Sequence, residues 1–231
     1  MLKGIDISNW QSGLSISAVK PGFCIAKATE GNFFVDRCCD GFIQESIALG
    51  IPWGFYHFAR EYSPEDEAKF FYDNCTGYVG RGIPVLDYEV WGNNDNDVKW
   101  CERFLAKFHD LSGIWPMIYI SASHCADFQG SWVPGKCGLW VAGYPHDTDK
   151  YPGNIVVPYN IEPWEFAAIW QFTSGLLLKG YDGLLDGDIA FMDKKAWGKY
   201  AGVSTTGEKI VEKPKEEKKV ITGRVTIELD G

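Results

Sequence analysis

No apolar run in this 231-residue chain reaches the roughly 20 consecutive apolar residues that a membrane-spanning helix needs. The opening residues, MLKGIDISNW, also lack the apolar core of a signal peptide. The seven cysteines form no CxxC pair and are odd in number, which indicates neither a zinc knuckle nor a disulfide framework. We therefore expect a protein without membrane insertion, made in the cytoplasm and holding buried free thiols.

Positive charge is scarce as well. The chain has 22 Lys and Arg against 31 Asp and Glu, and residues 1–202 carry the whole net charge of −9 because the remainder is balanced. A nucleic-acid partner would require a basic stripe that neutralises phosphates, so this class of partner is not expected. Aromatic residues are abundant instead, at 15% with ten Trp, and their flat faces suit sugar rings.

Eight short apolar runs rich in β-branched and aromatic residues divide the chain and predict β-strands. They occupy residues 4–8, 23–29, 51–58, 83–90, 115–121, 138–145, 167–174 and 184–191. Helical spacing and start signals predict helices over residues 36–49, 63–74 and 97–111. Connections rich in Pro and Gly after Trp140 predict irregular loops. The pattern predicts an α/β fold: an irregular, TIM-like (β/α) barrel of about eight strands with few helices in its last third.

Polar residues close these apolar runs, where a barrel enzyme places its chemistry. A carboxylate late in a buried strand is costly unless it is paired or functional. We therefore treat the following residues as candidates: Asp6, Ser8, Lys27, Glu30, Tyr56, His57, Asp87, Glu89, Tyr119, Ser121, Tyr144, Gln171, Asp186 and Asp188.

The sharpest motif is Asp87-Tyr88-Glu89 within IPVLDYEVW. Strand residues two apart point to the same side, so both carboxyl groups share one face while Tyr88 points away. Two acids held close in a partly buried site cannot both ionise easily, so one of the two pKa values rises. A carboxyl group that keeps its proton near neutral pH is the general acid that glycosidic cleavage requires.

Eight ordered motifs make the chain resemble the family 25 glycoside hydrolases, the lysozymes of bacteriophages, bacteria and some fungi. The motifs are GIDISNWQ, IAKATEG, GFYHF, VLDYEVW, IYIS, LWVAGY, IWQFTS and LDGDIAF, from about Gly4 to Asp193. The resemblance implies N-acetylmuramidase activity: hydrolysis of the β-1,4 bond from N-acetylmuramic acid to N-acetylglucosamine in peptidoglycan. It implies an irregular β/α barrel and no metal or organic cofactor.

The resemblance also implies residue roles. Glu89 matches the general acid, and Asp87 matches the residue that orients the substrate or polarises its acetamido group. Asp6 and Asp186 complete the acidic cleft, with Asp188 as the alternative fourth acid. The expected substrate-binding residues are Tyr56, Tyr119, Trp140, Tyr144, Gln171 and Asp188. Lys27 with Glu30 is interpreted as an ion pair at the barrel rim, and His57 as structural.

Two mechanisms and three functions stay open at this stage. The substrate's acetamido oxygen attacks the anomeric carbon in one mechanism, and an activated water inverts the configuration in the other. Besides a muramidase, the alternatives are a chitinase-type hydrolase, for which Pro84 and Val85 stand where further acids are wanted, and a catalytically silent carbohydrate-binding barrel.

The chain changes character after residue 202. Residues 1–202 are expected to form the catalytic barrel, residues 203–219 a charged linker, and residues 220–231 a strand-like tail of undecided role. The missing signal peptide favours a phage endolysin that reaches the cell wall through a separate holin-type pore. Neither the host nor the oligomeric state follows from the sequence.

Overall fold

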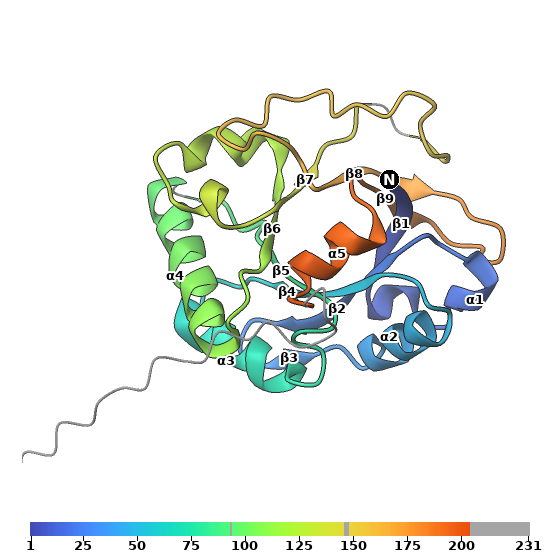
Figure 1. The fold of residues 1–231 in the computed structure, drawn as a ribbon, viewed down its shortest axis with the longest axis horizontal. Coiled ribbons are helices and arrows are strands. Elements are labelled where there is room, and N and C mark those ends of the chain that lie inside the picture. Colours follow the sequence, from blue (N-terminus) through green and yellow to red (C-terminus); the bar gives the residue numbers. More distant parts are fainter. Residues whose placement is uncertain (93, 146–147, 204–231) are drawn as a thin grey trace, which may run out of the picture.

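A closed barrel of eight strands forms the centre of the molecule (Figure 1). The computed structural model describes residues 1–92, 94–145 and 148–203. The barrel strands are β1 (Leu2–Ile7), β2 (Cys24–Glu30), β4 (Trp53–Phe58), β5 (Ile83–Asp87), β6 (Met117–Ser121), β7 (Leu139–Ala142), β8 (Ile169–Leu176) and β9 (Leu185–Ala190). A two-residue strand, β3 (Phe34–Val35), pairs with β2 beside the barrel. Each of the eight predicted strands is present, which confirms the TIM-like barrel.

The direction of β9 decides where its acidic residues lie. The strands from β1 through β8 run parallel to their barrel neighbours, whereas β9 runs antiparallel to both β1 and β8. The start of β9 therefore lies at the carboxyl ends of the other strands, with Asp186 opposite Asp6. The expectation that Asp186 and Asp188 close the last strand was wrong, because Asp186 lies at its start and Asp188 in its middle.

Helices cover the outside of the first two thirds of the barrel. They are α1 (Ile16–Val19), α2 (Cys39–Ala48), α3 (Pro64–Cys75), α4 (Asn94–Ser112) and α5 (Lys194–Tyr200), with 3-10 turns η1 (Asn9–Gln11), η2 (Ala122–Phe128) and η3 (Val133–Gly135). In α3, Pro64 occupies the first turn and three acidic residues follow it, which suits the positive helix start. Between β7 and β8 the described residues contain neither helix nor strand, as the Pro and Gly content predicted.

Helix α5, which the sequence did not predict, closes the amino end of the barrel. The side chain of Asp193 caps it by accepting a hydrogen bond from the Ala196 amide at 2.8 Å. Trp197 packs against Phe23 with ring centroids 4.9 Å apart, and its indole nitrogen donates to the Trp53 carbonyl at the start of β4. In Figure 1 the helix lies across the barrel, so the carboxyl end is the open one.

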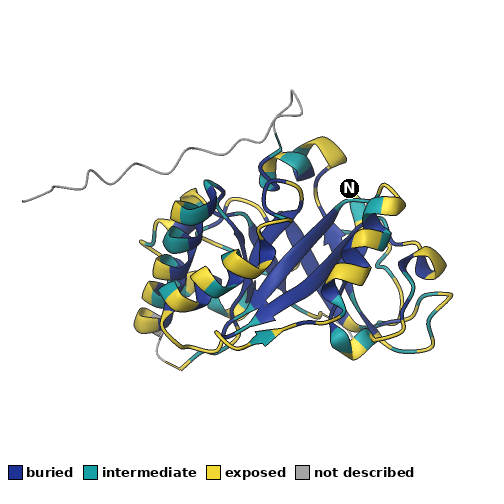
Figure 2. Ribbon diagram, turned by 90° about the horizontal axis from the view of Figure 1, so that it is seen from below, coloured by how far each residue is buried: buried dark blue, intermediate teal, exposed yellow. Residues whose placement is uncertain are grey.

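The core occupies both the barrel interior and the layer between strands and helices. Figure 2 shows the strands buried along nearly their whole length, whereas each helix keeps one exposed face. All seven cysteines are unpaired; six are buried and Cys38 is partly so, as expected of free thiols. Strands covered on both faces tolerate few polar residues, so those that remain identify the site.

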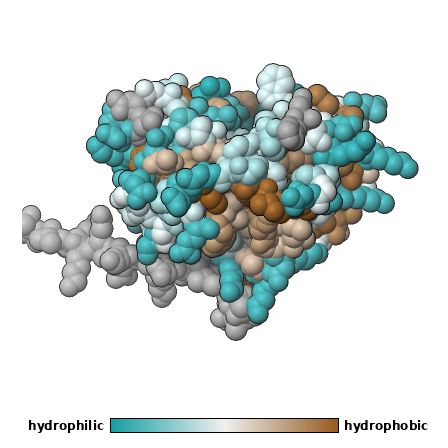
Figure 3. All heavy atoms as spheres, turned by 90° about the horizontal axis from the view of Figure 1, so that it is seen from above, coloured by the Kyte–Doolittle hydropathy of each residue, from teal (hydrophilic) through white to brown (hydrophobic). Residues whose placement is uncertain are grey.

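The surface is mainly hydrophilic on the face in Figure 3, where apolar side chains gather in one patch. No helix within the described ranges has the length and apolar character that crossing a membrane requires. Residues 204–231 lie outside the described residues, and with them all but Val203 of the expected linker and the whole expected terminal strand.

Candidate active site

A pocket of about 340 Å³ opens at the carboxyl end of the barrel. Its wall contains nine of the ten residues that sequence reasoning placed in the site: Asp6, Tyr56, Asp87, Glu89, Tyr119, Trp140, Tyr144, Gln171 and Asp186. They come from seven different strands or the residues directly after them. The closed barrel thus brings side chains up to 180 positions apart in the sequence to one cavity.

Asp87 and Glu89 form the first acidic pair of the pocket. Strand β5 ends at Asp87, and Glu89 follows two residues later on the same side, whereas Tyr88 is fully buried on the other. Each carboxyl group shifts the pKa of the other. Burial raises the pKa of Asp87 well above its usual value, and the charge of Glu89 raises it further.

The pKa of Glu89 is also raised, chiefly by burial of its carboxyl group, although the contact with Asp87 and the charge of Lys27 act in the opposite direction. The residue as a whole is exposed, whereas Asp87 is only 7% exposed and its Oδ1 atom is buried without a donor. The pair therefore holds a proton to higher pH than isolated acids do, and Glu89 is the member that a ligand meets.

Asp6 is held by an amide and two tyrosines. The Gln171 amide donates from Nε2 to Oδ2 of Asp6 at 2.7 Å. The Gln171 Oε1 atom accepts from the hydroxyls of Tyr119 at 2.7 Å and Tyr144 at 2.5 Å. These donors fix which way the amide faces, so three residues expected to bind substrate also orient a carboxyl group.

The acids of β9 lie at two depths. Asp186, opposite Asp6, is partly buried and lines the pocket, and burial together with the charges of Asp6 and Glu89 raises its pKa. Asp188 is fully buried beneath the pocket and accepts a hydrogen bond from the Trp140 indole nitrogen at 2.9 Å. Of the two alternatives for the fourth acid, Asp186 is the one that reaches the cavity.

Sequence reasoning missed several residues of the pocket wall. Trp10 follows β1 directly and is 83% exposed at the pocket, although a Trp within the polar stretch ISNWQ was a usable signal. Lys27 forms the expected ion pair with Glu30, but it also lines the pocket, and its charge lowers the pKa of Asp87 and Glu89. The others are Ile7, Gln11 and Phe58, whereas Ser8, a candidate at the end of the first strand, also lines the pocket.

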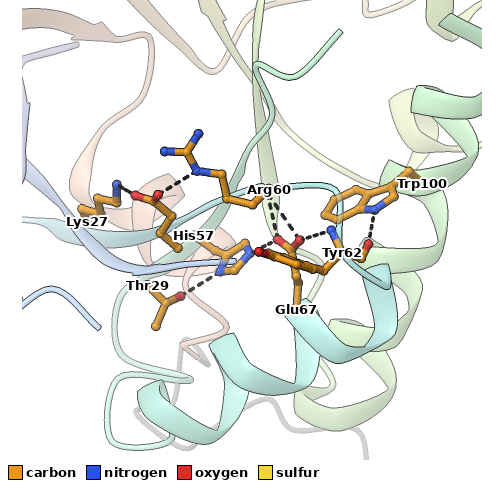
Figure 4. A network of polar contacts seen from close by, with 8 residues as sticks. Lys27, Thr29, His57, Arg60, Tyr62, Glu67 and Trp100 are labelled. Atoms are coloured by element: carbon orange, nitrogen blue, oxygen red, sulfur yellow. Dashed lines mark hydrogen bonds and ion pairs between the residues drawn. The ribbon is translucent and has the colours of Figure 1, made fainter. Parts of the chain in front are cut away.

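His57 lies outside the pocket, in the buried network drawn in Figure 4. Its Nδ1 lies 2.8 Å from the Thr29 hydroxyl, and its Nε2 lies 2.8 Å from Oε2 of Glu67. Burial lowers the pKa of His57, so the ring is neutral and donates to the Glu67 carboxylate. This geometry is that of a structural histidine.

Metal binding has no support in the described ranges, where no group of three or more His, Cys, Asp or Glu side chains has a geometry suited to an ion. The pocket acids instead face one another and the cavity, with aromatic side chains around them. Acids with raised pKa values at the carboxyl ends of barrel strands, beside aromatic rings, define a glycoside hydrolase.

The chain belongs to glycosyl hydrolases family 25, whose profile matches residues 5–181. It is 29% identical to Lysozyme M1 of Streptomyces globisporus over 203 residues, covering 80% of this chain and 66% of that protein. It is 26% identical to the N,O-diacetylmuramidase of a Chalaropsis species over 219 residues, covering 85% and 100%.

A solved structure shares the fold. The bacterial lysozyme of Streptomyces coelicolor superimposes with a TM-score of 0.73 at 25% identity, covering 87% of this chain and 96% of that one.

The lysozyme of Streptococcus phage Cp-9 is 33% identical over 129 residues, and the match spans 52% of this chain but only 36% of the phage protein.

Proposed function

We propose that this chain hydrolyses peptidoglycan at the β-1,4 bond between N-acetylmuramic acid and N-acetylglucosamine. The observation that carries the proposal is the Asp87–Glu89 pair, which retains a proton and presents Glu89 to the pocket. The similarity to Lysozyme M1 and to an N,O-diacetylmuramidase supports this substrate class.

Glu89 is the general acid in this proposal. Its carboxyl group donates a proton to the glycosidic oxygen, so the leaving sugar departs as an alcohol. Asp6 and Asp186, which face the same cavity, stabilise the positive charge that develops at the anomeric carbon. The acids thus divide into one proton donor and two electrostatic partners.

Asp87 favours the substrate-assisted mechanism. An inverting pair needs roughly 6.5–9.5 Å between carboxyl groups to admit a water, and a covalent retaining pair about 5–5.5 Å. Asp87 and Glu89 come from the end of the same strand, so both carboxyl groups approach a bound sugar from one side and do not flank its glycosidic bond. We therefore assign Asp87 to orienting the substrate's acetamido group, whose oxygen attacks the anomeric carbon.

The shape of the site suits a polymer. A second hollow of about 530 Å³ shares Glu89, Tyr119 and Tyr144 with the first, so the general acid lies between the two. A glycan chain lying across both places its scissile bond at Glu89. The exposed ring of Trp10 offers a flat face to a sugar on the first side.

A phage endolysin is the biological role that we propose. The similarity to the lysozyme of Streptococcus phage Cp-9 supports it. In this role the enzyme reaches the wall from inside the cell through a separate pore and acts when the host is lysed.

The products of digestion test the proposed bond. Purified peptidoglycan is digested, reduced with borohydride and analysed by mass spectrometry. We expect new reduced ends on N-acetylmuramic acid and no new free amino groups. Reduced N-acetylglucosamine ends would instead identify a glucosaminidase, and new amino groups a peptide-bond hydrolase. For the mechanism, NMR of the first product should show retained anomeric configuration, because two successive displacements restore it.

A further inference from the structure

Asp188 is a buried titratable group that the proposed reaction does not use. It lies in the middle of β9, is 0% exposed and is absent from the pocket wall. The antiparallel register places it opposite Gly4, one inward-facing position below the pair of Asp186 and Asp6. A carboxyl group at this depth needs a hydrogen-bonding role that compensates for its burial.

The hydrogen-bond donors around Asp188 and Asp6 leave one buried oxygen without a partner. Trp140 donates to Oδ1 of Asp188, and Gln171 donates to Oδ2 of Asp6. The Oδ2 atom of Asp188 is buried with no hydrogen-bond partner, and the neighbouring strand carries Asp6, whose charge acts on the Asp188 carboxyl group. Two neighbouring carboxylates buried together repel each other, so one of the two keeps its proton.

The surroundings assign that proton to Asp188. Asp6 reaches the pocket and accepts from the Gln171 amide, which stabilises its ionised form, whereas Asp188 is fully enclosed. The titratable groups that face Asp188 are Asp6, Asp186, Cys24, Tyr144 and Tyr151. None of these is a cation that would compensate a second buried carboxylate.

We propose that Asp188 is a positioning residue: its protonated carboxyl group donates a hydrogen bond to Asp6 and holds Asp6 as the carboxylate that faces the substrate. Trp140 anchors the other oxygen of Asp188, so the donor points at Asp6. The inference rests on the proposed function only in the use it gives to Asp6. The protonation of Asp188 itself can be tested without substrate.

Thermal unfolding of Asp188→Asn provides that test. The amide can accept from Trp140 and donate to Asp6 as the protonated acid does, but it takes no proton from solution. A group whose pKa is higher in the folded chain makes the folded state bind more protons, so wild-type stability falls as the pH rises above about 4. We therefore expect Asp188→Asn to melt at least about 3 °C above wild type at pH 7.

This advantage should shrink greatly or reverse at pH 4, where the acid is protonated in the folded chain and about half protonated in the unfolded chain. The matched control is Asp182→Asn, which removes an exposed carboxylate from the connection between β8 and β9 and should show no such pH-dependent gain. An Asp188→Asn variant whose melting difference from wild type is the same at pH 4 and pH 7 would overturn the proposal.

Activity tests the positioning role. Asp188→Asn should keep wall hydrolysis within about threefold of wild type and leave the acid limb of kcat/KM in place, because Asp6 keeps its donor. Asp188→Leu removes the hydrogen-bond donor to Asp6, which raises the pKa of Asp6. The acid limb of the kcat/KM profile should then move to higher pH, and kcat should fall about 10-fold or more. A limb that moves to lower pH in Asp188→Asn would show that Asp188 is ionised and would contradict the inference.

The two proposals fail in distinguishable ways. If wild type releases no sugar ends from peptidoglycan, the proposed function fails, while the melting curves still decide whether Asp188 is protonated. If Asp188→Leu does not fold, infrared spectroscopy decides whether Asp188 is protonated. We expect the carbonyl band of a protonated carboxylic acid in wild type at pH 7, and its loss in Asp188→Asn. Absence of that difference would contradict the proposal.

Discussion

Two buried acidic clusters lie around the same barrel, and they differ in how their oxygens are satisfied. In the network of Figure 4, Glu67 accepts from His57 and from the amides of Arg60 and Tyr62. Glu30 in the same network pairs with Lys27 and Arg60. By contrast, Asp87 in the pocket wall and Asp188 beneath the pocket each keep a buried oxygen without a donor.

The difference separates structural acids from functional ones. The donors around Glu67 satisfy its carboxyl oxygens, so Glu67 holds the neighbouring residues in place. Burial and the charges of other acids raise the pKa values of Asp87 and Asp188, so these two carboxyl groups hold protons to higher pH. Burial alone therefore does not mark an acid as part of the functional cluster; a buried oxygen without a donor does so for Asp87 and Asp188.

A large effect, and the sharpest contrast between the two clusters, is expected from Asp87→Asn. The amide keeps the shape but loses the charge that orients the acetamido group, so kcat should fall about 10²–10³-fold. Because the raised pKa of Asp87 destabilises the fold at neutral pH, the melting midpoint at pH 7 should stay equal or rise. Initial rates on purified walls and melting curves measure both; a variant that is unstable yet active would remove Asp87 from the functional cluster.

The opposite pattern is expected for Glu67→Gln. The amide nitrogen of the introduced glutamine would face the hydrogen-bond donors of His57 or Tyr62. One buried hydrogen bond would then be lost, which lowers the free energy of unfolding by about 1–3 kcal/mol. The melting midpoint should fall by about 2–4 °C for each kcal/mol, while kcat of the folded protein stays near wild type. Loss of kcat without loss of stability would show that the compensated network takes part in the chemistry.

The comparison also shows what the sequence could predict about the site. Eight of the nine pocket residues were candidates because they lie at the ends of apolar runs, whereas Trp140 was expected in the site only because of the resemblance to family 25. The depth of Asp188 was not predictable, since it depends on the direction of β9. In a parallel strand Asp188 would have lain nearer the rim than Asp186, whereas the antiparallel strand places it deeper.

The fold was predictable where the pattern is periodic. Residues 97–111 repeat apolar side chains at helical spacing and lie within α4, which runs from Asn94 to Ser112. Helix α5 was not predicted because its seven residues are too few to show a helical period. Tertiary contacts of Trp197 hold this helix in place. Trp10 was not predicted because an aromatic residue is more often part of the core, and only its polar neighbours in ISNWQ pointed to an exposed ring.

A smaller effect is expected at the pocket rim. Trp10→Ala removes an exposed ring whose side chain makes no hydrogen bond to either acidic cluster. The free energy of unfolding should therefore change by no more than about 0.5 kcal/mol. If the ring stacks on a sugar, KM for soluble glycan fragments should rise severalfold while kcat stays within about twofold. An unchanged KM would exclude Trp10 from substrate binding.

The smallest effect is expected at a solvent-exposed ion pair between helix α3, which also carries Glu67, and helix α4. Glu65 and Arg103 form a hydrogen-bonded pair at 2.7 Å, with both side chains partly in water. Exposed pairs contribute little, so Glu65→Gln should leave the melting midpoint within about 2 °C and the activity unchanged. It is thus the matched control for Glu67→Gln, and a large effect would mean that helix α3 tolerates no amide substitution.

The most direct test of the central claim is the rate at which Glu89→Gln releases reducing sugar ends from purified peptidoglycan, measured beside wild type. The amide keeps the shape of the side chain but cannot deliver a proton to the glycosidic oxygen. We predict a loss of about 10²–10⁴-fold with an unchanged melting midpoint. A folded Glu89→Gln protein with near wild-type rates would contradict the assignment of this acidic pocket as the catalytic site.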